Sequence, residues 1–228
     1  MALLTPDESK ATLLSSRRAW SRTRRAGPVR RIASVLALRR QRERTERRRL
    51  IVTTARAIAE AEGWAAVTTR RLAEAIEYSQ PLIYSHFASM IEISDAVAVQ
   101  GFAELTRSLH SASAASAGPA EGLSALAHRY LDFAHSAPAT YSAMFSRDTT
   151  LTFAAPDSPE PLRAGFGALA DVMRAATGEH DLDTRTELFW SSLHGLATLT
   201  SGHRLRADAA DDRIRLLVEQ VTGAAVSQ

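Results

Sequence analysis

The residues between Val67 and Phe87 include side chains whose chemistry suits contact with nucleic acid. Gln80 can form hydrogen bonds with adenine, and Pro81 or Leu82 can touch the methyl group of thymine. Hydroxyl, guanidinium and imidazole groups suit backbone phosphates, and here they belong to Thr69, Arg70, Tyr84 and His86. The chemistry expected of this segment is therefore recognition of double-stranded DNA.

Two short helices must position these groups, and the sequence predicts where each begins. Thr68 can cap the first helix with its hydroxyl group, and Val67 and Leu72 have the spacing of a hydrophobic staple. Ser79 is a suitable capping residue for the second helix. Pro81 lies in the first turn of that helix, where its missing amide hydrogen costs nothing.

The faces of the second helix follow from a rotation of about 100° per residue. Ile83 and Phe87 point toward the core of the unit, whereas the opposite side presents Pro81, Leu82, Tyr84 and Ser85. A helix-turn-helix places such a side in the major groove of DNA, with its N-terminal residues at the base edges. The alternative is a three-helix unit without a ligand, in which His86 and Tyr84 merely pack.

The run from Leu50 to Asp95 resembles the DNA-binding domain of the TetR family of bacterial transcriptional regulators. The matching marks are the TTR start of one helix, the SQP entry to the next, the aromatic pair in IYSHF and a further helix that follows at once. The resemblance implies that operator DNA is contacted by Thr69, Arg70, Gln80, Pro81, Leu82, Tyr84, Ser85 and His86.

Two positions depart from the pattern of that family. Glu77 stands in the turn where the family usually has glycine, so a positive φ there would strain the backbone. Met90 stands where the family usually has a lysine at the start of the fourth helix, so a phosphate contact is lost.

Charge is distributed unevenly along the chain. Residues 1–49 carry fifteen basic and four acidic side chains, a net charge of +11, and residues 50–228 carry thirteen basic and twenty-one acidic ones, a net charge of −8. We expect residues 1–44 to be an arginine-rich, disordered arm that is attracted to DNA by counterion release and compensates for Met90. The alternatives are a solvated tail, translated sequence upstream of the natural start, or an organelle transit peptide.

Helical periodicity begins at Thr45, and Gly63 is placed to end that first helix in a left-handed conformation. Strand signals are nearly absent. The expected fold class is all-α: a three-helix helix-turn-helix domain over residues 45–90, followed by a helical-bundle ligand-binding and dimerisation domain over residues 91–228. Further helices are predicted at residues 89–110, 121–136, 138–146, 161–177, 183–205 and 208–222.

The later helices resemble the regulatory half of the same family through APATYSAMF and FWSSLHGLATL, the second of which is similar to a Trp…His-Gly pattern found in one branch. The resemblance implies a pocket for a small apolar or amphipathic effector whose binding opposes DNA binding. The expected lining residues are Met144, Phe145, Phe166, Trp190 and His194. Aromatic and methionine residues at helical spacing are also typical of plain core, which is the alternative.

A homodimer is expected from the last two helices. No charged residue occurs from Leu188 to Gly202, so that helix should be buried on more than one side. The predicted interface consists of Leu193, Leu196, Leu199, Ile214, Leu217, Val218 and Val221. Two-fold symmetry would set two recognition helices roughly 34 Å apart on a palindromic operator.

Other classes of function find little support. The chain has no cysteine, HExxH pair, GxSxG elbow or phosphate-cradling glycine loop, so we expect no catalytic residues, no metal and no cofactor. No signal peptide or membrane span is expected either, and a cytoplasmic location follows. Two rivals to a ligand-responsive repressor stay open: a non-specific nucleic-acid binder that acts through its arginine-rich arm and, less favoured, a helical enzyme.

Overall fold

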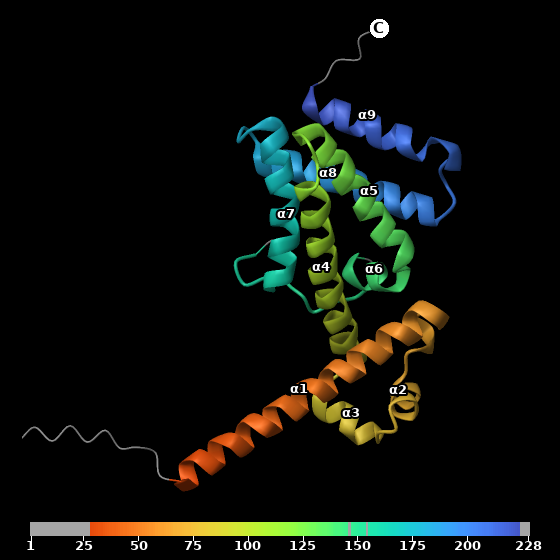
Figure 1. Ribbon diagram of the computed structural model, residues 1–228. Helices are drawn as coiled ribbons and strands as arrows, with labels where there is room; N and C mark the ends of the chain where they lie inside the picture. The colour runs from red at the N-terminus through yellow and green to blue at the C-terminus, as the bar shows by residue number, and fades with distance from the viewer. Residues whose placement is uncertain (1–27, 146, 154, 224–228) are drawn as a thin grey trace, which may run out of the picture. The chain divides into compact units, whose positions relative to one another are not determined.

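The computed structural model describes residues 28–145, 147–153 and 155–223, and within these ranges the chain is helical without a strand (Figure 1). The predicted all-α fold is confirmed. The α-helices are α1 (Pro28–Glu62), α2 (Thr69–Ala75), α3 (Gln80–His86), α4 (Met90–Ala114), α5 (Pro119–Ser136), α6 (Pro138–Phe145), α7 (Glu160–Thr177), α8 (Leu182–Ser201) and α9 (Ala210–Thr222). Short 3-10 turns, η1 (Trp64–Ala66) and η2 (Ala207–Ala209), precede α2 and α9.

The first helix begins at Pro28 rather than at Thr45, so the predicted arm is helical over residues 28–44. The absence of apolar periodicity indicates that the segment is not buried. It does not exclude a helix, because arginine, alanine and leucine all have high helix propensity. An ion pair between Arg39 and Glu43, four residues apart at 2.9 Å, adds support. The part of the predicted arm at residues 1–27 lies outside the described residues.

The start of α2 agrees with the prediction from sequence. The Thr68 hydroxyl accepts a hydrogen bond from the backbone N–H of Arg71 at 3.1 Å, and both Val67 and Leu72 are buried. Ser79 holds the N-cap position of α3, although its side chain makes no capping hydrogen bond. Gly63 ends α1 with the positive φ that was predicted, 83°, but its ψ of 163° is extended rather than left-handed helical.

One apolar core runs through the helix-turn-helix and into the bundle. In the former, α1 contributes Ile51 and Ala55, α2 contributes Leu72, and α3 contributes Ile83, all nearly inaccessible to water. Phe87, directly after α3, completes this cluster. Burial of these side chains fixes which side of α3 is left for solvent.

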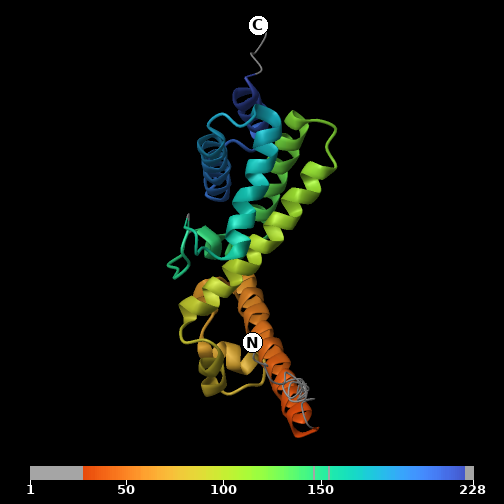
Figure 2. The ribbon, with the colours of Figure 1, turned by 90° about the vertical axis from the view of Figure 1, so that its left-hand side faces the viewer.

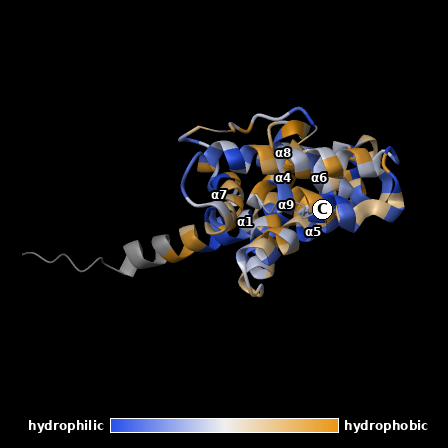
Figure 3. Ribbon diagram, turned by 90° about the horizontal axis from the view of Figure 1, so that it is seen from above, coloured by the Kyte–Doolittle hydropathy of each residue, from blue (hydrophilic) through white to orange (hydrophobic). Residues whose placement is uncertain are grey.

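The bundle is built around α4, which packs along α5, α6 and α7 (Figures 1 and 2). Helices α8 and α9 contact α5 and α7. Each bundle helix carries both hydrophobic and hydrophilic segments in Figure 3, as helices with one buried side do. Among the described residues no single helix is long and apolar enough to cross a membrane; by length and composition only α3 and α4 together pass that test, bent by 58°.

Candidate DNA-binding surface and ligand pocket

The outward side of α3 carries the residues that were predicted to read DNA. Gln80, Pro81, Tyr84 and Ser85 are exposed, Tyr84 to 57%, whereas Ile83 and Phe87 are 1% exposed. Leu82 is half-buried and its carbonyl oxygen accepts a hydrogen bond from the Ser85 hydroxyl at 2.7 Å. The helix therefore presents small, apolar and hydroxyl-bearing groups on a single side.

Two residues at the start of α2 flank this surface. The Thr69 hydroxyl donates a hydrogen bond to the Tyr84 hydroxyl at 3.2 Å, which joins the N-terminus of α2 to α3. The side chain of Arg70 is 80% exposed and lies 3.9 Å from Glu74. An exposed ion pair this long contributes little to stability, so the guanidinium is available to another anion.

His86 departs from the prediction that it reaches a phosphate. Its side chain is only 8% exposed, and its buried Nδ1 atom has no hydrogen-bond partner among the described residues. The reason is helical geometry: residue 86 is three positions after Ile83 and so turns back toward the core. Burial, together with the guanidinium groups of Arg44, Arg47 and Arg48, lowers the pKa of His86 below its usual 6.5 and keeps the ring neutral.

Arg48 on α1 holds the C-terminus of α3 in place, and sequence reasoning missed this role. Its guanidinium donates to the backbone oxygen of His86 and to the Glu92 carboxylate at 2.8 Å, and it lies 3.9 Å above the ring of Phe87. A cation at a helix C-terminus also interacts favourably with the negative end of the helix dipole. Arg48 thus ties α1, α3 and α4 together.

Glu92 connects this tie to the start of α4. It accepts a hydrogen bond from the backbone N–H of Ala88 at 2.7 Å, while its own N–H donates to the Ser89 hydroxyl at 3.2 Å. These bonds resemble a capping box. The Ala88 N–H and Arg48 lower the pKa of Glu92, so the carboxylate stays ionised.

The turn between α2 and α3 contains the strained residue that the sequence indicated. Glu77 has a φ of 56°, in the left-handed region. The Tyr78 N–H donates to the Ala73 carbonyl at 2.9 Å and the Glu77 N–H donates to the Glu74 carbonyl at 3.4 Å. This is a Schellman motif, in which the residue at the position of Glu77 is usually glycine.

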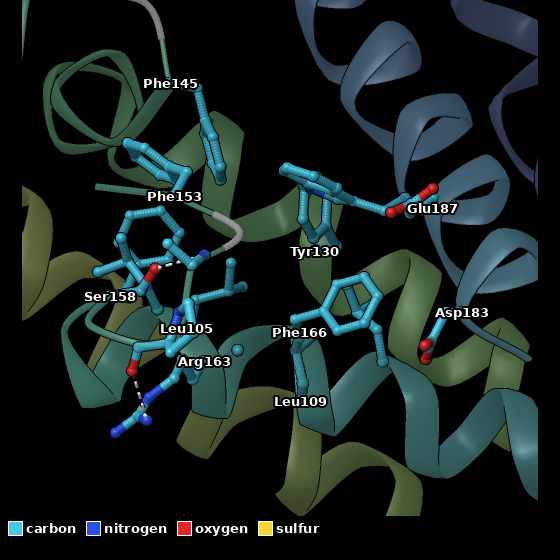
Figure 4. A pocket seen from close by; sticks show the side chains of 17 residues that line it. Leu105, Leu109, Tyr130, Phe145, Phe153, Ser158, Arg163, Phe166, Asp183 and Glu187 are labelled. Atoms are coloured by element: carbon cyan, nitrogen blue, oxygen red, sulfur yellow. Dashed lines mark hydrogen bonds between the residues drawn. The ribbon is translucent and has the colours of Figure 1, made fainter. Parts of the chain in front are cut away.

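The bundle encloses a pocket of about 540 Å³ (Figure 4). Six aromatic rings line it: Phe102, Tyr130, Phe145, Phe153, Phe166 and Trp190. Phe145, Phe166 and Trp190 were predicted as lining residues and lie in the wall. The pocket has the size and apolar character of a small-molecule site.

Met144 and His194 were also predicted to line the pocket, but neither does. Met144 is 2% exposed and fills the space beside Gly101, where an added Cβ would lie 2.7 Å from the Met144 sulfur. His194 stacks on Tyr141, with ring centroids 5.7 Å apart. Met144 points about 100° around α6 from Phe145, toward Gly101 of α4 and away from the cavity.

A chain of hydrogen bonds runs behind the pocket wall from Trp190 to His194. The Trp190 Nε1 donates to the Tyr130 hydroxyl at 3.1 Å, which lies 3.0 Å from the Tyr141 hydroxyl, which in turn lies 2.7 Å from His194 Nδ1. Because an indole only donates, the Tyr130 hydroxyl accepts from Trp190, and its second lone pair and its own hydrogen allow either direction toward Tyr141. Burial lowers the pKa of His194 and raises that of Tyr130 to about 12, so both groups are neutral near pH 7.

Helix α6 is attached to α1 through Glu60. The Glu60 carboxylate accepts hydrogen bonds from the backbone N–H groups of Ala139 and Thr140, both at 2.9 Å, and from the Thr140 hydroxyl at 2.6 Å. Trp64, just after α1, donates through Nε1 to the Ala139 carbonyl at 2.8 Å. A carboxylate at a helix N-terminus is favoured by the helix dipole, so the first turn of α6 is firmly held.

Three residues of the predicted dimer interface are instead core of the single chain. Leu193, Ile214 and Val218 are exposed to 0%, 2% and 7%. An apolar stripe predicts burial but not the partner, and here α5 and α7 supply it. The remaining four divide between partly buried residues, Leu196, Leu217 and Val221, and the exposed Leu199.

Of the three exposed leucines on α8 and α9, Leu199 belongs to the predicted interface, and Leu188 and Leu216 lie outside it. Leu188 is 65% exposed, Leu199 39% and Leu216 49%. Gly195 lies between Leu188 and Leu199 on α8, and a Cβ added there would meet nothing within 4 Å. This side of α8 is therefore apolar and open in the single chain.

Over the part of the chain that the structure describes, no group of three or more histidine, aspartate or glutamate side chains has the arrangement to hold a metal ion.

Comparison with known sequences agrees with both halves of the chain. A profile of bacterial regulatory proteins of the tetR family matches residues 51–97, and a profile of the tetracyclin repressor-like C-terminal domain matches residues 123–222. No curated protein sequence matches the chain.

Solved structures share the fold. A protein of unknown function from Rhodococcus sp. RHA1 is 23% identical, with a TM-score of 0.63 over 79% of this chain and 95% of that one. A bacterial regulatory protein in the tetR family from Rhodococcus RHA1 is 16% identical, with a TM-score of 0.56 over 76% and 96%. A TetR variant from Acinetobacter baumannii AYE, in complex with minocycline, is 18% identical, with a TM-score of 0.54 over 76% and 93%.

Proposed function

Because the chain belongs to the TetR family of bacterial transcriptional regulators, we propose that it is a ligand-responsive repressor in the bacterial cytoplasm. It binds a palindromic operator as a homodimer and is released by a small apolar or amphipathic effector. The observation that carries the proposal is the division of α3 into a buried side with Ile83 and an exposed side with Gln80 and Tyr84.

Within this proposal the exposed residues have separate tasks. Gln80 and Pro81, at the start of α3, are placed to meet base edges, because a recognition helix enters the major groove by its N-terminal end. Thr69 and Arg70, at the start of α2, and Tyr84, further along α3, meet backbone phosphates. His86 acts indirectly, since its side chain is buried and its carbonyl oxygen is held by Arg48.

The proposed dimer uses the open side of α8. Leu188 and Leu199 flank Gly195 there, and a second copy related by two-fold symmetry would cover all three. Leu188→Glu should lower the mass measured by light scattering to that of a monomer. Ala175→Glu, at an exposed position on α7, is the matched control and should leave the mass unchanged. A monomeric mass for the unaltered chain contradicts the dimer.

The experiment that tests the function is selection of binding sites from random duplexes by the purified full chain, followed by footprinting. We expect a palindrome with half-site centres roughly 34 Å apart. Gln80→Ala should relax the preference at one position at a cost of about 1–3 kcal/mol, whereas Arg70→Ala should weaken binding to all sequences.

The same assay separates this function from non-specific binding through the arginines of α1, which are exposed at Arg39, Arg40, Arg42, Arg44, Arg47 and Arg49. Specific binding survives an excess of random DNA, whereas binding through backbone charge does not. Failure to select any common sequence, with equal losses for Gln80→Ala and Arg70→Ala on all duplexes, counts against base reading.

A further inference from the structure

The pocket in the bundle carries two carboxylates as well as its aromatic wall. Asp183 and Glu187 lie on α8, four residues apart, and both contribute to the lining. Figure 4 shows them together on the α8 side of the pocket, close to Phe166. Both side chains are exposed to solvent, so the repulsion between them is weak, and together they place negative charge at the mouth of the pocket.

No arginine, lysine or histidine among the described residues lies within ion-pair distance of either carboxylate. Arg174, for example, forms ion pairs with acids on α7 and just after it, and Arg215 forms ion pairs with acids on α9. Asp183 lies in the first turn of α8, where the helix dipole favours an anion. Glu187 is a turn further on, at a solvent-exposed position of the same helix.

Arg163, the basic residue in the pocket wall, does not form an ion pair with Asp183 or Glu187. Arg163 donates a hydrogen bond to the backbone oxygen of Pro156 at 3.2 Å. In Figure 4 it lies on the opposite side of the pocket from Asp183 and Glu187, with its guanidinium turned away from them. The α8 side of the pocket is therefore negatively charged.

We propose that the pocket takes a lipophilic cation: an apolar or aromatic body that carries a protonated or quaternary amine, or an equivalent onium centre. Its body lies among Phe102, Phe145 and Phe166, and its charge lies between Trp190 and the carboxylates. Aromatic faces attract such cations because of their quadrupole, most strongly where water is excluded. This inference rests on the proposed role of the pocket as effector site and names the class of effector.

Three probes of similar bulk test the charge preference on the full chain: tetraphenylphosphonium, neutral triphenylphosphine oxide and tetraphenylborate. Binding is measured by calorimetry and by quenching of tryptophan fluorescence. We expect the cation to bind at least about tenfold more tightly than the neutral probe, because the two carboxylates attract it. Solvent at the pocket rim screens part of this attraction and so limits the preference. The anion should bind most weakly.

The double substitution Asp183→Asn and Glu187→Gln removes the charge and keeps the shape. It should weaken binding of the cation about tenfold and leave the neutral probe unchanged. Asp208→Asn, an exposed acid outside the pocket, is the matched control and should change neither. Equal affinity for the three probes, no binding of any, or a cation affinity that the double substitution does not lower overturns the inference.

A second readout separates the ligand class from the proposed function. Release of the selected operator duplex is followed by fluorescence anisotropy with each probe. If the cation binds with the expected charge dependence but leaves the duplex bound, the ligand class stands and the effector role falls. If the neutral probe binds as tightly as the cation and releases the duplex, the effector role stands and the ligand class falls.

Discussion

Replacing Glu77 by glycine should stabilise the protein, because Glu77 has a φ of 56° at a position where a Schellman motif usually has glycine. A residue with a side chain costs about 1–2 kcal/mol in the left-handed region. Glycine recovers this cost but adds about 0.4–1 kcal/mol of unfolded-state entropy. The Glu77 side chain is exposed and forms no ion pair or side-chain hydrogen bond with the described residues, so little else is lost.

At the middle of these ranges the net gain is about 0.8 kcal/mol, which for a chain of this length raises the melting temperature by about 2–3 °C. Differential scanning calorimetry measures the shift. Glu77→Ala is the matched control, because it removes the carboxylate and keeps the strain of a side chain at positive φ. Glu77→Asn should fall between the two, since asparagine tolerates this conformation better than most residues.

The order of the three variants decides the question. If Glu77→Gly melts at or below the temperature of Glu77→Ala, backbone strain at this turn is not what limits stability. All three variants also remove a carboxylate from the turn that precedes α3, so all three should bind operator DNA more tightly, and to the same extent.

Four further predictions concern packing, charge and pH. Arg48→Met should lower the free energy of unfolding by about 1–3 kcal/mol, measured by urea titration, because the His86 carbonyl and Glu92 lose a charged partner. Gly101→Ala should cost about 1–3 kcal/mol despite the gain in helix propensity, because its Cβ would lie 2.6 Å from Thr140 Cγ2; Gly167→Ala, with nothing within 4 Å, should be neutral or stabilising. Since burial lowers the pKa of His194, the unfolded chain takes up the proton first, so stability should fall as the pH drops below the usual 6.5 and stay level above it. The pKa of His86 is lowered as well, so His194→Gln should make that decline shallower without removing it in pH-dependent thermal melts, and an equally steep decline would argue against His194. Glu60→Gln should bring the operator affinity measured with bound probe closer to the affinity measured without it, as followed by anisotropy. An unchanged difference between the two affinities would show that the Glu60 contact does not couple the pocket to DNA binding.

Local pattern was enough to predict the elements of the DNA-binding half. Thr68, Val67 and Leu72 lie within six residues, so one short segment of sequence contains both the cap and the hydrophobic staple of α2. The buried side of α3 followed from the spacing of Ile83 and Phe87 alone. Helix periodicity is sufficient for such features because every residue involved belongs to the same or the next turn.

Features that depend on distant residues escaped prediction. Arg48 meets His86 and Glu92 across 38 and 44 residues, and one more arginine in a basic run gives no local signal of that role. Leu193 and Ile214 were correctly expected to be buried, but an apolar stripe does not say whether its cover comes from the same chain or a second copy. Only the packing of the bundle shows that the cover comes from the same chain.

Helix α6 provides a physical connection between the pocket and the DNA-binding half. Its last residue, Phe145, forms part of the aromatic wall, and its first turn is bound to α1 through Glu60. Gly101 brings α6 close to α4 in the middle, where Thr140 and Met144 leave no room for even a methyl group. An element that is held at its first turn and packed tightly in its middle moves as a body rather than bending, because dense packing transmits displacement. A ligand that shifts Phe145 is therefore opposed by the hydrogen bonds to Glu60. Under the proposed function, a ligand that opposes DNA binding would act through these contacts and those along α4.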